Sequence, residues 1–216
     1  MGQYYKPVIL NENNKPVMYA SCYDLGSGAK LMEHSWIPNP FVRFIEAMLI
    51  TNPSKIVWAG DYADQEKPST LTKDEIKFHS VKDSEYNSEE IIKEEGINLY
   101  KLSEGVGKMV IDEEIPKGKD KYSYDYKKIA PLRYKYLINF YKEEFVDKSK
   151  TPKDADGWQI HPLPLLTCEG NGRGGGDFRG NGEGLVGRWS RDKIGVVSKK
   201  SDIPKGFEEV DFDLSE

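Results

Sequence analysis

Runs of apolar and β-branched residues at the start of the chain predict a β-hairpin. Residues 4–10 and 16–23 are both β-prone, and the sequence Asn-Glu-Asn-Asn-Lys separates them. Asparagine tolerates positive φ and is therefore common in the turns between strands. A further apolar run at 55–59 predicts a strand that ends at Gly60 and Asp61.

Apolar side chains then recur at helical spacing, at Phe41, Phe44, Ile45, Met48 and Leu49. Asn39 stands at the N-cap position and Pro40 at the first helical position, where its missing N–H is not needed. Asn52 and Pro53 follow the last turn. This pattern predicts a helix over residues 40–51, and it is the one clear helix signal in the chain.

The composition changes between residues 65 and 128, which are rich in Lys and Glu and poor in apolar residues. Within this segment the pattern predicts a short helix at 88–95 and short strands at 98–102 and 108–115. A charge run most often forms a solvated face. We therefore interpret the segment as a charged insertion in a single α+β domain that spans residues 1–200.

The second half of the chain predicts two more hairpins, one pairing 134–140 with 144–148 and one pairing 185–190 with 193–198. Residues 201–216 are acidic, and we expect them to form a mobile tail. The predicted fold class is α+β, with a mainly antiparallel β-sheet and one helix.

The order of parts in the two halves is similar. Each half has a hairpin, then a histidine near a proline, then a predicted strand with a tryptophan three residues before an aspartate. The tryptophans are Trp58 and Trp189, and the aspartates are Asp61 and Asp192. An internal duplication is one explanation. The other is that strand and turn chemistry makes any β-rich chain resemble itself.

Net charge and cysteine content limit the classes of function. The 216-residue chain carries a formal charge of −5, which disfavours a dedicated DNA-binding protein. Its two cysteines suit a reducing compartment. Apolar runs are shorter than a membrane span, and the first residues do not form a signal peptide, so we expect no membrane association.

The most unusual stretch is glycine-rich, with nine of the twenty glycines between Gly170 and Gly187. Glycine loses more backbone entropy on folding than any other residue, so a dense run suggests a linker or a backbone that approaches a partner closely. The charged residues within the run argue against an inert linker. We interpret the stretch as a loop that contacts a ligand or partner.

The loop residues expected to bind are Arg173, Gly174, Gly175, Gly176, Asp177 and Arg179. Successive loop N–H groups and the two arginines suit a phosphate or another anion. The spacing Gly170-x-Gly172-x-x-Gly175 matches the dinucleotide fingerprint, but that fingerprint requires a helix to follow. Here more glycines and a predicted strand follow, so we reject a dinucleotide fold.

His34 and His161 occupy matching places in the two halves, and we include both among the candidate ligand-binding residues. With Asp61 and Asp177 they suit acid–base chemistry or a metal. The alternative is that they are structural histidines hydrogen-bonded at strand ends. Paired Cys and His motifs of zinc sites do not occur, so we predict no metal and no cofactor.

Three stretches resemble a known family. They are MGQYYK at the start, VWAGDYAD at 57–64, and GNGRGGGDFRGN followed by VGRWSRDKI within 170–194. Together they are similar to a group of small uncharacterised proteins encoded by bacteriophages and by mobile elements of bacteria. The resemblance covers about half of the chain. It implies a setting in the cytoplasm of a bacterial host, and it carries no activity or catalytic residue.

Three functional hypotheses follow. The first is a non-enzymatic, phage-encoded protein that binds a small anionic, nucleotide-like ligand or a host protein and blunts host defence. The second is a hydrolase for a phosphorylated metabolite that uses His34, His161 and Asp177. The third is a minor virion or assembly component, which only the phage setting supports.

Overall fold

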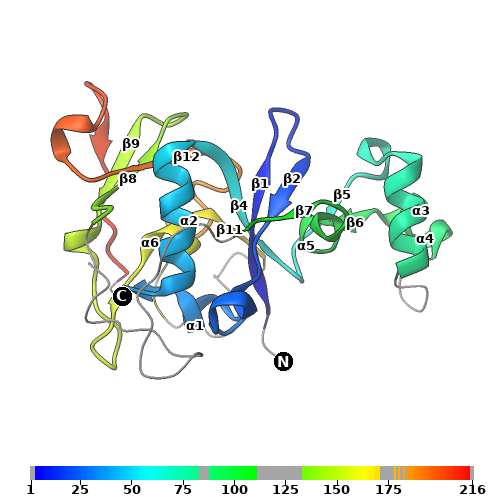
Figure 1. The fold of residues 1–216 in the computed structure, drawn as a ribbon, viewed down its shortest axis with the longest axis horizontal. Helices are drawn as coiled ribbons and strands as arrows, with labels where there is room; N and C mark the ends of the chain where they lie inside the picture. The colour runs from blue at the N-terminus through cyan, green and yellow to red at the C-terminus, as the bar shows by residue number, and fades with distance from the viewer. Residues whose placement is uncertain are drawn as a thin grey trace.

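The computed structural model describes residues 3–82, 88–110, 133–170, 178, 180, 182 and 184–214. Its main element is a mixed β-sheet of nine strands in the order β13-β9-β8-β12-β4-β1-β2-β7, with β11 also paired to β4 (Figure 1). The strands are β1 (Tyr5–Leu10), β2 (Pro16–Tyr19), β4 (Ser54–Gly60), β7 (Gly107–Lys108), β8 (Tyr136–Asn139), β9 (Glu144–Asp147), β11 (Cys168–Glu169), β12 (Lys193–Val197) and β13 (Glu208–Glu209).

Two smaller sheets accompany the main one. β3 (Trp36–Ile37) pairs with β10 (Gln159–Ile160), and β5 (Gln65–Glu66) pairs with β6 (Ile97–Asn98). The helices are α1 (Leu31–His34), α2 (Pro40–Thr51), α3 (Lys73–Lys82), α4 (Glu89–Glu95), α5 (Leu99–Leu102) and α6 (Pro162–Thr167). The α+β class is therefore confirmed, but the sheet is mixed, and the described residues form six helices where the sequence showed one clear helix.

Two features explain these corrections. β11 pairs with β4, β7 with β2 and β13 with β9 in parallel, and each of these ladders joins only two residues of each strand. Two residues are too few to show the alternation of apolar and polar side chains by which a strand is recognised in a sequence. Likewise α1, α5 and α6 have four to six residues, too few for a helical period to appear.

Locally encoded elements form as predicted. The Asn39 side chain caps α2 by accepting hydrogen bonds from the backbone N–H groups of Phe41 and Val42, at 2.9 and 3.2 Å. β1 and β2 pair antiparallel, as do β8 and β9. The short helix predicted near 88–95 is also present as α4, whose N-cap Ser88 accepts from the N–H of Ile91.

The last predicted hairpin is wrong. β12 pairs with β8 and β4, whereas residues 184–190 form turns. Gly184 and Gly187 have φ angles of +78° and +75°, which no strand accommodates. Trp189 consequently lies in a turn while Trp58 lies in β4, so the two halves do not place their tryptophans in related elements.

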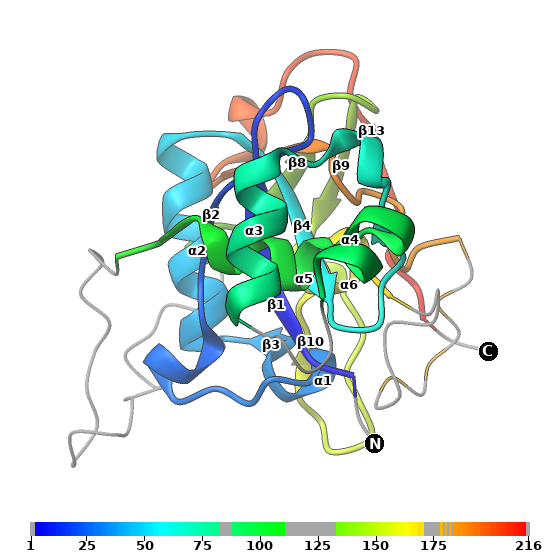
Figure 2. The same ribbon diagram turned by 90° about the vertical axis from the view of Figure 1, so that its right-hand side faces the viewer.

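The main core lies on one face of the sheet, where α2 and α6 pack against it (Figure 1). The opposite face is covered by α5 over β1 and β4 (Figure 2) and by Ile203 and Phe207 over β8 and β9. On β4, Ile56 and Trp58 face the main core, and Val57 and Ala59 face α5. The segment at 65–128 therefore supplies part of the packing of the sheet, although its composition suggested only a solvated insertion.

The C-terminal residues are also packed rather than forming a mobile tail. β13 pairs with β9, and Phe212 and Leu214 are buried in the main core. Between residues 210 and 214 apolar side chains alternate with Asp211 and Asp213. This period of two places one face against the core, and the acidic composition of the segment concealed it.

We expect Leu99→Ala in α5 to lower the free energy of unfolding by about 2–5 kcal/mol, because Leu99 is 1% exposed beneath the second face. Ile91→Ala in the neighbouring α4 is the control, since Ile91 is 40% exposed. Urea denaturation of both variants measures the difference. Equal, small effects would show that the segment at 65–128 does not belong to the core.

Candidate functional site

The glycine-rich stretch leaves the sheet at the end of β11 and returns before β12. Arg173, Gly174, Gly175, Gly176, Asp177 and Arg179 lie outside the described residues. Some of its described positions are closely packed: a Cβ on Gly170 would lie 2.5 Å from both Gln3 Nε2 and Tyr5 Oη, so a larger residue there would displace these side chains. These positions border two cavities.

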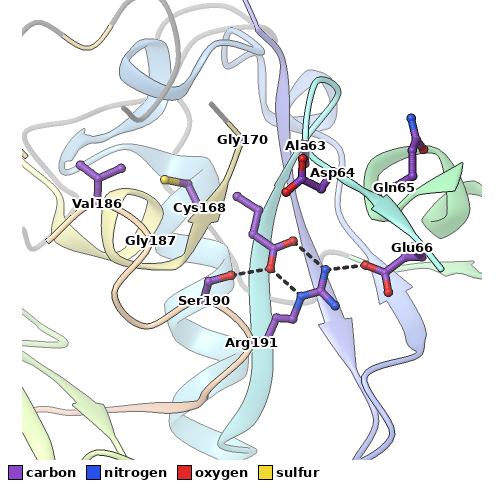
Figure 3. A pocket seen from close by; sticks show the side chains of 11 residues that line it. Ala63, Asp64, Gln65, Glu66, Cys168, Gly170, Val186, Gly187, Ser190 and Arg191 are labelled. Atoms are coloured by element: carbon purple, nitrogen blue, oxygen red, sulfur yellow. Dashed lines mark hydrogen bonds and ion pairs between the residues drawn. The ribbon is translucent and has the colours of Figure 1, made fainter. Parts of the chain in front are cut away.

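The first, the carboxylate cavity, has a volume of about 340 Å³ and is lined by Gly170, Val186 and Gly187 together with a charged wall (Figure 3). The charged wall consists of Asp64, Glu66, Glu169 and Arg191. The cavity lies where the parallel strands β4 and β11 end and their loops diverge, a position that favours ligand binding in open sheets.

Arg191 holds this wall together. Its Nη2 donates to Glu169 Oε2 at 2.9 Å and also to Glu66, while Ser190 Oγ donates to Glu169 Oε1 at 2.8 Å. Burial opposes the charge of Arg191, but the hydrogen bonds and charges of Glu169 and Glu66 outweigh it and raise the guanidinium pKa. Arg191 is thus committed to these carboxylates. Three carboxylates against one guanidinium leave the wall with a net charge of −2.

Cys168 also lines the carboxylate cavity, but its thiol is not activated. Burial raises its pKa to about 12, and Sγ donates to the carbonyl of Leu165. A thiol that stays protonated is a poor nucleophile and a poor metal ligand. Among the residues that the structure describes, no group of three or more His, Cys, Asp or Glu side chains is arranged to hold a metal ion.

The second, the apolar cavity, has a volume of about 680 Å³. Phe178 and Gly180 bring the glycine-rich stretch into its lining, beside Met32, Ile160 and Leu214. A Cβ on Gly180 would lie 2.9 Å from the Phe178 ring, so the glycine makes room for that ring. The polar lining residues are Lys153, Asp154 and Asp156.

The structure places both candidate histidines in the core rather than on either cavity. His34 is fully buried, its Nδ1 donating to the carbonyl of Gly28 at 3.0 Å and its Nε2 accepting from Trp58 Nε1 at 2.8 Å. These two bonds require a neutral ring. Burial lowers the pKa of His34 to about 4, so His34 serves to position Trp58 in the core.

His161 is close to His34 because β10 pairs with β3, and its backbone N–H donates to the carbonyl of Ser35. Its Nδ1 accepts from the N–H of Leu163 and caps α6, which leaves Nε2 with the proton, 3.2 Å from Glu46 Oε1. Glu46 also pairs with the fully buried Lys148. This buried ionic cluster gave no sequence signal, because its members come from three distant segments.

The pKa values of the cluster follow from burial and mutual attraction. Burial lowers the pKa of Lys148 and of His161, with Glu46 opposing both shifts. For Glu46, burial acts to raise the pKa, but the charge of Lys148, with a smaller contribution from the nearby His161, outweighs burial and lowers it. Glu46 and Lys148 are therefore an ion pair in the interior, where charges are stable only when paired.

Comparison with protein-family models, with curated proteins and with solved structures finds no match to this chain. Within the described ranges, no helix combines the length and the apolar character that crossing a membrane requires.

The burial of His34 predicts a loss of stability in acid. Its pKa falls from 6.5 to about 4 on folding, so between these values the unfolded chain binds a proton that the folded protein excludes. The free energy of unfolding should therefore decrease as the pH falls through this window, by about 3 kcal/mol from this group. Urea denaturation of wild type and His34→Gln between pH 7 and 4 tests this. Parallel pH profiles would contradict it.

Breaking the buried ion pair should be costly, whereas removing both charges should not. Lys148→Met leaves the Glu46 charge buried and should lower the free energy of unfolding by about 3–5 kcal/mol. The double variant Glu46→Gln/Lys148→Met should recover most of this loss, because no unpaired charge then remains buried. Thermal and urea unfolding compare the two. Equal instability of both variants would refute an uncompensated charge as the cause.

Proposed function

We propose that this chain is a non-enzymatic binding protein of bacteriophage or mobile-element origin that takes a small nucleotide-like anion in the apolar cavity. The observation that carries the proposal is the place of Phe178 and Gly180 in the lining of that cavity. They flank Arg179, a residue expected to bind an anion. The volume of about 680 Å³ and the apolar side chains of the cavity are those of a typical small-molecule site.

Charge favours the apolar cavity over the carboxylate cavity for such a ligand. The wall of the carboxylate cavity has a net charge of −2, and its arginine is already paired. At about 6 Å and an effective dielectric constant of about 20, each unpaired negative charge opposes a phosphate charge by on the order of 3 kcal/mol. By the same count the lining of the apolar cavity has a net charge of −1, from Lys153, Asp154 and Asp156, so it opposes a phosphate less strongly.

The state of the titratable groups favours binding over hydrolysis. His34 and His161 are neutral and buried, both ring nitrogens of His34 make hydrogen bonds within the core, and Cys168 remains a thiol. Among the described residues, the carboxylates Glu66 and Glu169 are paired with Arg191 rather than poised to transfer a proton. Sequestration of a small nucleotide-like signal would then be the route by which the protein blunts host defence.

The test is calorimetric titration with a panel of nucleoside monophosphates, diphosphates and cyclic nucleotides, with chromatography to detect turnover. We expect binding without turnover. Arg179→Ala should weaken it about tenfold or more, as for the loss of one charge-assisted hydrogen bond of about 1.5–3 kcal/mol. Lys205→Ala, at an exposed lysine outside both cavities, is the matched control.

Turnover of a nucleotide would contradict a non-enzymatic binding protein and support the hydrolase hypothesis. Absence of binding across the panel would refute the proposed ligand. Equal weakening of nucleotide binding by Arg179→Ala and Lys205→Ala would show that the arginine acts only through its contribution to the net charge.

A further inference from the structure

We infer that Trp36 and Trp158 form a stacking platform beside the apolar cavity that recognises a planar nucleobase. This inference rests on the proposed function and specifies which part of the ligand the protein recognises. It depends on the placement of the two indoles, on the hydrogen bonds that fix them, and on the apolar lining next to them.

The two tryptophans share a face with the floor of the cavity. In the pairing of β10 with β3, Ile160 lies opposite Trp36, and residues directly opposite each other point to the same side. Trp158 packs against Trp36 and therefore lies on that side as well. The two indoles are outside the lining of the apolar cavity and adjoin it through Ile160, which does line it. Their ring centroids are 5.1 Å apart and the rings are inclined by 54°.

Trp158 is held in place although it is 50% exposed. Asp154 Oδ1 accepts from the N–H of Trp158 at 2.8 Å and from that of Asp156 at 3.0 Å. The N–H of Asp154 returns a bond to the carbonyl of Trp158, and Gly157 makes the turn with φ +85°. Trp36 is oriented by a hydrogen bond from Nε1 to the carbonyl of Glu33.

An exposed indole on a preorganised loop is the type of residue that dominates binding energy, because binding then costs little conformational entropy of the loop. A flexible loop would lose that advantage. The hydrogen bonds to Asp154 thus fix the loop between β9 and β10, although this loop is not needed for the packing of the core.

The chemistry of the surroundings selects the occupant. Met32, Ile160, Phe178 and Leu214 present apolar surface, against which a base can lie and the hydroxyl groups of a sugar ring would be unpaired. Stacking on aromatic rings suits every base. Asp156, an exposed carboxylate in the lining, can accept a hydrogen bond from an exocyclic amino group, which favours adenine, guanine and cytosine over uracil.

Intrinsic tryptophan fluorescence reports on the platform directly. The chain has four tryptophans, and Trp58 and Trp189 are fully buried in the core. Quenching by a bound base should therefore arise from Trp36 and Trp158. The probes are the 5′-monophosphates of adenosine, guanosine, cytidine and uridine. Ribose 5-phosphate, which keeps the phosphate and lacks the base, is the matched control ligand.

We expect the nucleotides to quench fluorescence and to bind at least about tenfold more tightly than ribose 5-phosphate. Trp158→Ala should weaken nucleotide binding about tenfold and leave ribose 5-phosphate unchanged. Trp158→Phe should retain most of the affinity, because a phenyl ring still stacks. Circular dichroism and the urea midpoint verify that each variant is folded.

Failure of the platform is distinguishable from failure of the proposed function. Nucleotide binding that is weakened by Arg179→Ala but not by Trp158→Ala would overturn the platform and leave the proposed function standing. Quenching by a neutral pyranoside, with none by the nucleotides, would overturn the nucleobase assignment. If neither the nucleotides nor ribose 5-phosphate bind the wild-type protein, both proposals fall.

Discussion

Strand β4 is the element on which the rest of the structure depends, because it has neighbours on both edges and on both faces. One edge pairs with β1 along six residues of each strand. The other is shared: β12 pairs with its first residues, Ser54 and Lys55, and β11 with Trp58 and Ala59 near its end. The middle of this strand is buried on both faces, which is why 56–59 is a continuous apolar run.

This central burial explains the role of the histidines. Trp58 must lie in the core, and its indole N–H needs an acceptor there, because an unpaired buried donor is costly. His34 supplies that acceptor, and the carbonyl of Gly28 fixes which nitrogen carries the proton. His161 ends a second network in which Glu46 and Lys148 satisfy each other. Both histidines thus take part in the packing of the core.

What the sequence could predict was local. Asn39, Pro40 and the apolar spacing after them determine α2 within one segment, and the hairpin of β8 and β9 joins neighbouring runs. The parallel ladders, the cover provided by α5 and the meeting of Trp36 with Trp158 depend on chain segments far apart in sequence. The glycine-rich stretch was recognisable as a candidate site from composition, but the cavities beside it depend on β4, β10 and the C-terminal residues.

The shared edge of β4 has an evolutionary consequence. Since β11 and β12 both pair with that one strand, the chain between them starts and ends at sites that the sheet holds fixed. Closing a longer loop across fixed ends costs little, only about 0.6 kcal/mol for each doubling of its length. A change in the length of the chain between β11 and β12 therefore costs the sheet little. The sheet is thus a fixed frame for a connection whose length can vary.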